Sequence, residues 1–352
     1  MGTRPEMIKL SALIPFIDKF YDHTLISTGQ HFSDSMFEEI RKSLKLRKPN
    51  ISLKFSQKLP KPLQLADIFT KLYQCVVKIS PNLVIVQGDT YSTLLGALVA
   101  HALGIKIFHI EAGARSFDQR MPEEIIRICV DHLAFLNQAF SEISLRNLKR
   151  EQLETKSILL PNSGIESIHR YRHLINKSNQ YEMLAKNSIL VTLHRNTNVD
   201  DYSQLTLIME KIFQLNKKHP IMFVTHPRTV KALKKILEDF TKKSTSKNFF
   251  PFHLVGPIPY LEFLNTIKNA KMIISDSGGI VEECHYLDKK LIILRESTEY
   301  KQLLRQGKIE LISATNFNNK RVAKMLTAPT TKSQKFKSQL KDYMRAIKSC
   351  FL

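Results

Sequence analysis

KMIISDSGGIVEE, residues 271–283, joins an apolar run to a glycine-containing turn and then to a helical pattern. The run 272–275 is typical of a buried parallel strand, and a helix is expected from Ile280 onward. A turn of this kind exposes backbone N–H groups, and the helix dipole adds about half a positive charge. Phosphate is the ligand that such a turn favours, and the candidate contacts are Ser277, Gly278 and Gly279.

Glu283 follows Gly279 by four residues, which places both on the same side of the predicted helix. A carboxylate there would repel a phosphate that it touched, so we expect it to accept hydrogen bonds from sugar hydroxyls, as on a nucleotide ribose. The alternative is an ordinary strand–helix turn in which an acidic first turn only stabilises the helix.

The composition is that of a folded globular protein and leaves several partner classes open. The chain has 352 residues, of which 43% are hydrophobic and 24% charged, and this length is enough for two domains. The net charge of +21 is compatible with nucleic acid, an anionic membrane surface or anionic small molecules. Because the lysines are spread over the whole length without a nucleic-acid-binding motif, we expect a solvated basic surface and no nucleic-acid partner. No apolar run reaches about 18 residues, so no membrane span is predicted.

The cysteines lie far apart in the sequence, at Cys75, Cys129, Cys284 and Cys350. None belongs to a Cys-x-x-Cys or Cys/His pattern, which argues against disulfides and against a metal site. They are typical of reduced thiols in a cytoplasmic protein.

Apolar runs and helical patterns alternate along the chain in two sets. The first set has strands at 24–28, 83–87, 106–110 and 158–161 and helices at 65–79, 92–103, 122–134 and 144–152. The second has strands at 188–193, 221–225, 253–255, 272–275 and 291–294 and helices at 202–217, 229–241, 261–270 and 280–287. Such alternation predicts two doubly wound α/β domains with parallel sheets. We expect an N-terminal domain over 1–165, a nucleotide-binding domain over 166–334, and a last helix at about 335–352 that returns to the first domain.

Ligands of open α/β sheets bind beyond the carboxyl ends of the strands. Polar loops follow six of the predicted strands, at 29–31, 88–90, 111–115, 194–196, 226–228 and 276–279. They are rich in acids, histidines and arginines. We therefore expect an active site in a cleft, with cations for phosphates and carboxylates for proton transfer.

The ordered set of these loops resembles the non-hydrolysing UDP-N-acetylglucosamine 2-epimerases. The matching pieces are GTRPE at 2–6 with Lys9, GQH at 29–31, GDT at 88–90, EAGAR at 111–115, PEE at 122–124 with Arg127, HR at 194–195, and DSGG at 276–279 with EE at 282–283. The resemblance implies the GT-B fold, with two Rossmann-like domains and the active site between them. It also implies interconversion of UDP-N-acetylglucosamine (UDP-GlcNAc) and UDP-N-acetylmannosamine (UDP-ManNAc) for surface glycans, without a cofactor and usually as a homodimer.

The chemistry of this reaction requires two kinds of group. The proton on carbon 2 of the sugar is hardly acidic, but departure of UDP from carbon 1 builds oxocarbenium character that acidifies it. Elimination then gives a glycal, and re-addition of UDP with protonation from the other face gives the epimer. The resemblance assigns proton transfer to Asp89, Glu111 and Glu123, with the base and the acid left open.

The departing diphosphate needs cations and N–H donors. The resemblance and the loop chemistry point to Arg4, Lys9, His194 and the turn at 277–279, and His194 could also protonate a phosphate oxygen. Further substrate contacts implied by the resemblance are Arg127, Arg195 and Glu283, with Tyr260 at the uracil pocket. Gln30, His31 and His226 match positions linked to a second, activating UDP-GlcNAc site in some bacterial members.

Ordinary structural roles compete for the same carboxylates. Asp89 could cap the helix that begins near Tyr91, and Glu123 could be an acid in the first turn of a helix that begins with Pro122. Glu111 ends a buried strand, where a carboxylate is costly without a partner, so a functional role is favoured there.

The chain departs from the family pattern in two places. Family members have an apolar strand before GTRPE, whereas this chain begins at Met1, so the first strand of the N-terminal domain is expected to be missing. Either the start lies upstream or activity is in doubt. In the second place, Tyr300 and Gln302 replace an Arg and a Glu of the usual TERPE motif, and Arg295 and Lys301 are the candidate substitutes.

Three other functions remain open from the sequence. A hydrolysing epimerase would release free ManNAc and UDP, although the EAG and PEE pieces argue against it. A GT-B glycosyltransferase would need an acceptor site that the sequence does not reveal. A catalytically inactive nucleotide-sugar-binding protein would follow from the lost strand.

Overall fold

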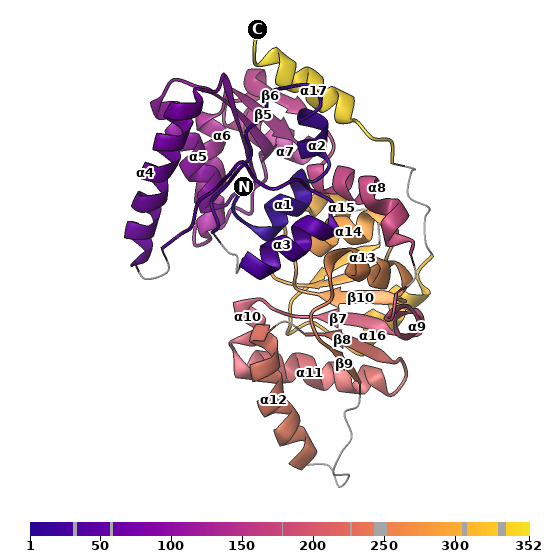
Figure 1. Cartoon of the computed structure of the whole chain (residues 1–352). Coiled ribbons are helices and arrows are strands. Elements are labelled where there is room, and N and C mark those ends of the chain that lie inside the picture. The colour runs from indigo at the N-terminus through magenta and orange to yellow at the C-terminus, as the bar shows by residue number, and fades with distance from the viewer. Residues whose placement is uncertain are drawn as a thin grey trace. The chain divides into compact units, whose positions relative to one another are not determined.

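The computed structural model describes residues 1–30, 34–56, 59–177, 179–225, 227–242, 252–304, 308–329 and 336–352. Two compact units are present: Met1–Tyr171 with Lys337–Leu352, called unit 1, and Arg172–Phe336, called unit 2. Each is an α/β unit with helices beside parallel strands (Figure 1). None of the described helices combines the length and the apolar character needed to cross a bilayer.

Unit 1 contains a parallel sheet in the order β3-β4-β5-β6. Its strands are β3 (Leu83–Gln87), β4 (Lys106–Ala112), β5 (Leu136–Ala139) and β6 (Ser157–Leu159). A second, two-stranded parallel sheet holds β1 (Ile26–Ser27) and β2 (Ile51–Ser52). The amino group and carbonyl of Met1 lie 3.0 Å from the Ile26 oxygen and 2.9 Å from the Thr28 nitrogen, so the first residue pairs with the chain at β1.

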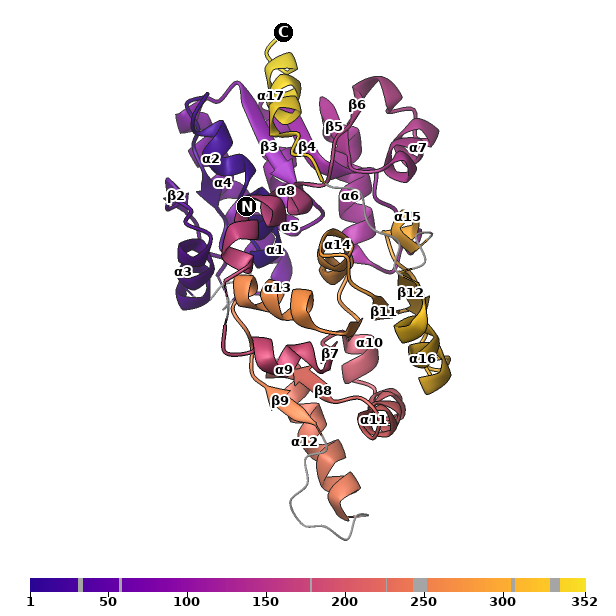
Figure 2. The ribbon, with the colours of Figure 1, turned by 90° about the vertical axis from the view of Figure 1, so that its right-hand side faces the viewer.

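Helices cover both faces of the larger sheet of unit 1, and successive side chains of β4 point alternately to the two faces. Phe108 and Ile110 pack on one face with side chains of α2 (Leu13–Ile17) and α17 (Leu340–Ser349). Ile107 packs on the other face with α5 (Tyr91–Ala102) and α6 (Pro122–Leu133). The C-terminal helix α17 thus contributes to the core of unit 1, and Figures 1 and 2 show it beside this sheet.

The remaining helices of unit 1 are α1 (Arg4–Leu10), α3 (Asp34–Ser43), α4 (Lys61–Ile79), α7 (Glu142–Arg150), the 3₁₀ turn η1 (Glu154–Lys156) and α8 (Ser163–Ile175). The last residues of α8, from Arg172, belong to unit 2.

Unit 2 contains a six-stranded parallel sheet in the order β12-β11-β10-β7-β8-β9. Its strands are β7 (Ile189–Thr192), β8 (Ile221–Val224), β9 (His253–Val255), β10 (Met272–Ser275), β11 (Leu291–Leu294) and β12 (Ile309–Ile312). The strand order reverses between β7 and β10, which is the topological switch point of a doubly wound sheet. The loops after β7 and β10 therefore lie where ligands of this fold bind.

The helices of unit 2 lie in the crossovers between its strands, except one that precedes β7 and one that follows β12. They are α9 (Glu182–Lys186), α10 (Asn196–Val199), α11 (Tyr202–Asn216), α12 (Pro227–Lys242), α13 (Tyr260–Asn269), α14 (Gly279–Tyr286), α15 (Lys301–Leu304) and α16 (Asn319–Thr327). The strands are buried throughout their length in β7, β10 and β11 apart from Thr192, as expected for a parallel sheet covered on both faces. The predicted fold class, two Rossmann-like doubly wound units, is confirmed.

Candidate active site

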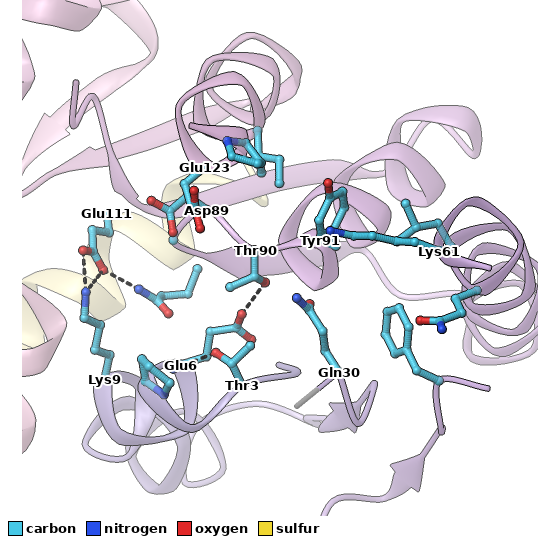
Figure 3. A pocket seen from close by; sticks show the side chains of 18 residues that line it. Thr3, Glu6, Lys9, Gln30, Lys61, Asp89, Thr90, Tyr91, Glu111 and Glu123 are labelled. Carbon is cyan, nitrogen blue, oxygen red and sulfur yellow. Dashed lines mark hydrogen bonds and ion pairs between the residues drawn. The ribbon is translucent and has the colours of Figure 1, made fainter. Parts of the chain in front are cut away.

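A cavity of about 620 Å³ opens in unit 1 at the carboxyl ends of β3 and β4. One end is lined by Lys9, Asp89, Glu111 and Glu123, and Figure 3 shows these side chains gathered on one side. Gln30, Lys61 and Tyr91 line the other end, where the Lys61 ammonium lies 4.3 Å from the centre of the Tyr91 ring. The three carboxylates that the resemblance singled out therefore share one cavity.

Glu111 occupies an irregular position at the end of β4. The register between β4 and β5 shifts there, and Glu111 has a φ of +73°, in the left-handed region that residues other than glycine rarely adopt. Its carboxylate accepts hydrogen bonds from Lys9 Nζ at 2.5 and 2.6 Å and from Gln87 Nε2. The Glu111 side chain is only 12% exposed, so these partners are what makes a buried carboxylate tolerable.

Asp89 follows β3 and does not cap the next helix. Thr90 is the N-cap of α5, and its hydroxyl and the side chain of Thr93 form a reciprocal capping box. The capping alternative for Asp89 is therefore wrong. The Asp89 carboxylate accepts from Arg127 Nη2 and remains one-third exposed, at 33%.

The adjacent acids of α6 have different surroundings. Glu124 is buried and accepts hydrogen bonds from the Ser116 nitrogen, the Ser116 hydroxyl and the Phe117 nitrogen, each at 2.9 Å. Glu123 is exposed and lines the cavity. Both lie in the first turn after Pro122, as the helix-start pattern predicts, but only Glu123 is placed for contact with a ligand.

Gly2 and Glu6, two residues of the GTRPE piece that were not candidate site residues, support the same wall. Glu6 is buried and accepts from the Gly2 nitrogen at 2.5 Å and from the Thr90 hydroxyl. A side chain at Gly2 would meet the Ser92 hydroxyl at 1.9 Å, so the chain before α1 packs too closely for any other residue. Glu6 stands in the GTRPE piece, but nothing in its spacing distinguished it from the other residues there.

In unit 2, Asp276 organises the loop after β7. Its buried carboxylate accepts from the His194 nitrogen at 3.0 Å, the Arg195 nitrogen at 3.0 Å and Asn198 Nδ2 at 3.1 Å. His194 Nδ1 lies 3.1 Å from the same carboxylate, and the His194 side chain is 37% exposed. Burial alone would raise the pKa of Asp276, but the hydrogen bond and charge of His194, with the bonds from Arg195 and Asn198, outweigh it and lower the pKa. Asp276 therefore orients His194 as an ionised partner, a role that sequence reasoning missed.

The turn Asp276–Gly279 leads into α14, whose N-cap is Gly278. A Cβ at Gly278 would lie 2.9 Å from Glu299 Oε1, 3.1 Å from Arg295 Nη1 and 3.8 Å from Arg195 Nη2. Two guanidinium groups therefore stand beside this turn. Burial is the main reason that the pKa of Arg295 is lowered, and Arg195 adds to the lowering while Glu299 opposes it.

Arg295 and Lys301, the two candidate substitutes for the missing arginine, differ in burial and in position. Arg295 is nearly buried beside Gly278, whereas Lys301 is exposed at the start of α15. Tyr300, which replaces the arginine, is buried with 3% of its surface exposed. Of the two cations, Arg295 is the one at the turn.

The other predicted site residues differ in burial and in their contacts. Arg127 and Tyr260 are buried, and Arg127 reaches Glu124 as well as Asp89. Arg4 and Glu283 are half-buried, on α1 and α14, and the structure does not bring Arg4 into the described lining of the cavity. Gln30 accepts from the Ser92 nitrogen and hydroxyl. His31 and His226 lie outside the described residues.

Known proteins resemble the chain over most of its length. A family model described as UDP-N-acetylglucosamine 2-epimerase matches residues 17–347. A UDP-N-acetylglucosamine 2-epimerase of Methanocaldococcus jannaschii is 37% identical over 317 residues, 87% of this chain and 85% of that protein. A UDP-2,3-diacetamido-2,3-dideoxy-D-glucuronate 2-epimerase of Pseudomonas aeruginosa is 31% identical, covering 89% of this chain and 87% of that protein. The crystal structure of the M. jannaschii UDP-GlcNAc 2-epimerase with UDP-GlcNAc and UDP superposes with a TM-score of 0.85 at 34% identity, over 99% of this chain and 98% of that chain.

Proposed function

Because the chain belongs to the UDP-N-acetylglucosamine 2-epimerase family, we propose that it interconverts UDP-GlcNAc and UDP-ManNAc without hydrolysis. The observation that carries the proposal is that Asp89, Glu111 and Glu123 line the same cavity in unit 1. Inversion at carbon 2 requires proton removal on one face and proton delivery on the other, which one carboxylate cannot easily do alone. A set of three acids in one cavity supplies both carriers, and each such group is typically worth about 10²- to 10⁴-fold in rate.

The reaction begins with cleavage of the bond between carbon 1 and the UDP oxygen. The electron pair leaves with UDP, positive charge develops at carbon 1, and a carboxylate removes the proton from carbon 2 to give the glycal. In the return step the UDP oxygen attacks carbon 1 while a second acid protonates carbon 2 on the opposite face. Atoms and charge balance without an oxidant, a reductant or an added cofactor.

We assign the diphosphate to residues of unit 2. The turn at Ser277, Gly278 and Gly279 offers backbone donors at the start of α14, and Arg195 and Arg295 supply positive charge beside it. His194, held by Asp276, presents an exposed imidazole that can donate a proton to the departing UDP oxygen. Glu283 and Tyr260 complete the proposed contacts, to the ribose and the uracil. In unit 1, Lys9 balances the charge of Glu111, and Arg127 acts through its ion pair with Asp89.

The test is to incubate the purified protein with UDP-GlcNAc in heavy water and to follow the proton NMR spectrum. UDP-ManNAc that carries deuterium at carbon 2 supports epimerisation by elimination and re-addition. Free ManNAc with UDP would move the protein to the hydrolysing enzymes. A folded sample that binds UDP-GlcNAc without exchange at carbon 2 would be a nucleotide-sugar-binding protein, and the proposed activity would fail.

We further propose that the protein is a cytoplasmic homodimer. Apolar side chains are exposed on three helices that neighbour one another in sequence, with Leu63, Tyr73 and Val77 on α4, Leu98 on α5 and Ile125 on α6. α4 packs on α5 and α5 on α6, so these side chains belong to one continuous layer of unit 1. A second copy is the partner that an identical apolar face fits. The four free cysteines suit the reducing cytoplasm.

Sedimentation equilibrium tests the dimer. The wild type is expected to sediment as a dimer, and Tyr73→Glu with Val77→Asp as a monomer, while the same changes at the exposed polar residues Gln74 and Lys78 leave the dimer intact. A monomeric wild type at micromolar concentration would overturn this part of the proposal.

Gln30, at the other end of the cavity, remains our proposed contact for a regulatory UDP-GlcNAc.

A further inference from the structure

A chain of four ionisable side chains lies behind the cavity of unit 1, and three of them are buried while the Glu151 side chain is 26% exposed. His109 Nδ1 lies 2.7 Å from Asp131 Oδ1, and Arg115 Nη2 lies 2.7 Å from Asp131 Oδ2. Arg115 in turn makes a bidentate pair with Glu151, at 2.8 and 2.6 Å. Within the described part of the chain none of the four lines the cavity. Buried ion pairs often contribute no net stability compared with apolar packing, so this network calls for another reason.

One end of the network holds the turn that carries Asp89. His109 is fully buried on β4, and its Nε2 lies 2.9 Å from the carbonyl oxygen of Gly88. Gly88 has a φ of +72° and directly precedes Asp89, so the orientation of its carbonyl is coupled to the path of the chain into Asp89. A hydrogen bond at this carbonyl therefore restrains the backbone of Asp89, and with it the direction in which the Asp89 carboxylate points.

The middle of the network, at Asp131, holds the loop that follows Glu111. Asp131 Oδ2 accepts from the Gly113 nitrogen at 3.1 Å, and Gly113 has a φ of +74°. Glu111, two residues earlier, has a φ of +73°. The Asp131 carboxylate thus connects the two loops. It pairs with the His109 imidazole, which contacts the Gly88 carbonyl, and it accepts from the backbone of the loop after Glu111.

The hydrogen-bond partners decide the form of the His109 ring. Both ring nitrogens face acceptor oxygens, a carboxylate on one side and a carbonyl on the other, so both must carry a proton to satisfy them. Burial alone would raise the pKa of Asp131, but the hydrogen bond and charge of His109, together with those of Arg115, lower it. The carboxylate is therefore ionised, and it balances the charge of the ring.

We propose that His109 is a positioning residue of the epimerase: as an imidazolium paired with Asp131, it fixes the Gly88–Asp89 turn relative to Glu111. This inference rests on the proposed function, because it concerns the placement of two of its carboxylates. It assigns His109 no contact with the substrate.

Two substitutions separate the two hydrogen bonds of the ring. In His109→Gln the side-chain amide nitrogen takes the place of Nε2 and can still donate to the Gly88 carbonyl, whereas in His109→Asn it takes the place of Nδ1 and reaches only Asp131. We expect His109→Asn to lower kcat about 10- to 100-fold with KM within about threefold of wild type, because misplacement of a reacting group acts on the chemical step. We expect His109→Gln to keep kcat within about fivefold, the usual weight of one lost hydrogen bond. The same pair of substitutions at His101, an exposed histidine in the last turn of α5, is the control and should change neither constant.

Hydrogen exchange of the peptide 86–92 gives a readout that does not need turnover. Exchange is expected to be faster in His109→Asn than in wild type and unchanged in His109→Gln. Equal kcat and equal exchange in both variants, or a loss confined to KM, would overturn the positioning role. A wild type with the expected exchange pattern but no epimerase activity would instead count against the proposed function alone.

The ring itself can be examined without any variant, in case His109→Asn does not fold. In the wild type labelled with ¹⁵N-histidine, both ring nitrogens of His109 should show a directly bonded proton, because each faces an acceptor oxygen. A shift typical of an unprotonated ring nitrogen would contradict the imidazolium and with it the proposal.

Discussion

The Nζ of Lys9 lies 2.5 and 2.6 Å from the two carboxylate oxygens of Glu111, although 102 residues separate them in the sequence. Both side chains are largely buried, with 17% and 12% of their surface exposed. The pair ties helix α1 to the irregular end of strand β4, and Gln87 Nε2 donates to the same carboxylate. The Glu111 side chain is thereby fixed in direction even though its backbone has an unfavourable φ.

Removal of the Lys9 ammonium is expected to harm both stability and activity. Lys9→Met leaves the Glu111 carboxylate without its cation, so the two substitutions Lys9→Met and Glu111→Gln should not be additive. A double-mutant cycle on the free energy of unfolding is expected to give a coupling of about 0.5–3 kcal/mol, the range found for residues in direct contact. Additive effects within about 0.5 kcal/mol would show that the ion pair contributes nothing.

The adjacent acids Glu123 and Glu124 are expected to separate activity from stability. Glu124→Gln should destabilise the protein by about 1–3 kcal/mol, because a charged acceptor of three hydrogen bonds becomes a neutral one. Glu123→Gln should leave the unfolding free energy within about 0.5 kcal/mol, since the side chain is exposed, and should lower kcat about 10²- to 10⁴-fold. Urea unfolding and the NMR exchange rate at carbon 2 measure the two effects. The opposite assignment, with Glu123→Gln unstable and still active, would remove Glu123 from the catalytic set.

Two glycines with similar backbone angles provide a test of close packing under the active-site loop. A Cβ at Gly113 (φ +74°) would lie 2.3 Å from the Ser144 carbonyl oxygen, whereas a Cβ at Gly104 (φ +69°) meets nothing within 4 Å. Gly104→Ala should cost about 1–2 kcal/mol for the left-handed backbone alone. Gly113→Ala carries the same backbone cost and a backbone clash, so it should be the more destabilising by at least about 1 kcal/mol. Thermal unfolding of both variants compares them, and equal losses would mean that the loop 111–115 yields freely.

The parts of the fold that could be predicted are those with regular apolar patterns. Strands β3 and β10 have the predicted bounds, because runs such as LVIVQ and MIIS are bounded by turn residues. Strand β5 was missed because its sequence, LNQA, is half polar. Its Gln138 accepts from the Glu111 nitrogen and donates to the Leu160 carbonyl, so the polar side chains are buried to satisfy the backbone at the irregular end of β4. Such a role depends on neighbours distant in sequence and leaves no periodic signal.

The candidate site also has residues that could be predicted from the sequence and residues that could not. Loop position after the strands, together with the family resemblance, was enough to bring Asp89, Glu111 and Glu123 into one group, and the structure places all three on the cavity. The residues that hold them were not predictable. His109 has the place of an ordinary strand residue, and Asp131 has that of an ordinary helix residue, so only the folded chain reveals their contact.

The pH dependence of stability should reveal Asp276. Its pKa is lowered in the folded state, because the bonds and charge of His194 and its neighbours outweigh burial. A carboxyl group with a lowered folded pKa stabilises the protein above its unfolded pKa, about 3.9, and loses that contribution as the pH falls through the folded value. Between pH 7 and pH 3 the wild type should therefore lose more unfolding free energy than Asp276→Asn. Parallel pH profiles of the two proteins would show that the pKa of Asp276 is not lowered in the folded state.

Glu166 should show the opposite sign. Its buried carboxyl accepts from the Ser338 hydroxyl at 2.7 Å and the Gln339 nitrogen at 2.6 Å, and so joins helix α8 to the segment before α17. Burial raises the pKa of Glu166, and the bonds from Gln339 and Ser338 only partly oppose it. A raised folded pKa means that the folded state holds the proton more tightly than the unfolded state. The unfolding free energy then declines as the pH rises from the unfolded pKa, about 4.3, through the folded value.

Glu166→Gln, which keeps an acceptor for the Gln339 nitrogen and carries no charge, should remove this decline. Urea unfolding of both proteins at pH 5 and pH 7.5 measures it, with Glu154→Gln as an exposed control. If wild type and Glu166→Gln differ equally at the two pH values, the carboxyl does not titrate in this window, and the link between α8 and α17 is held by an ionised group.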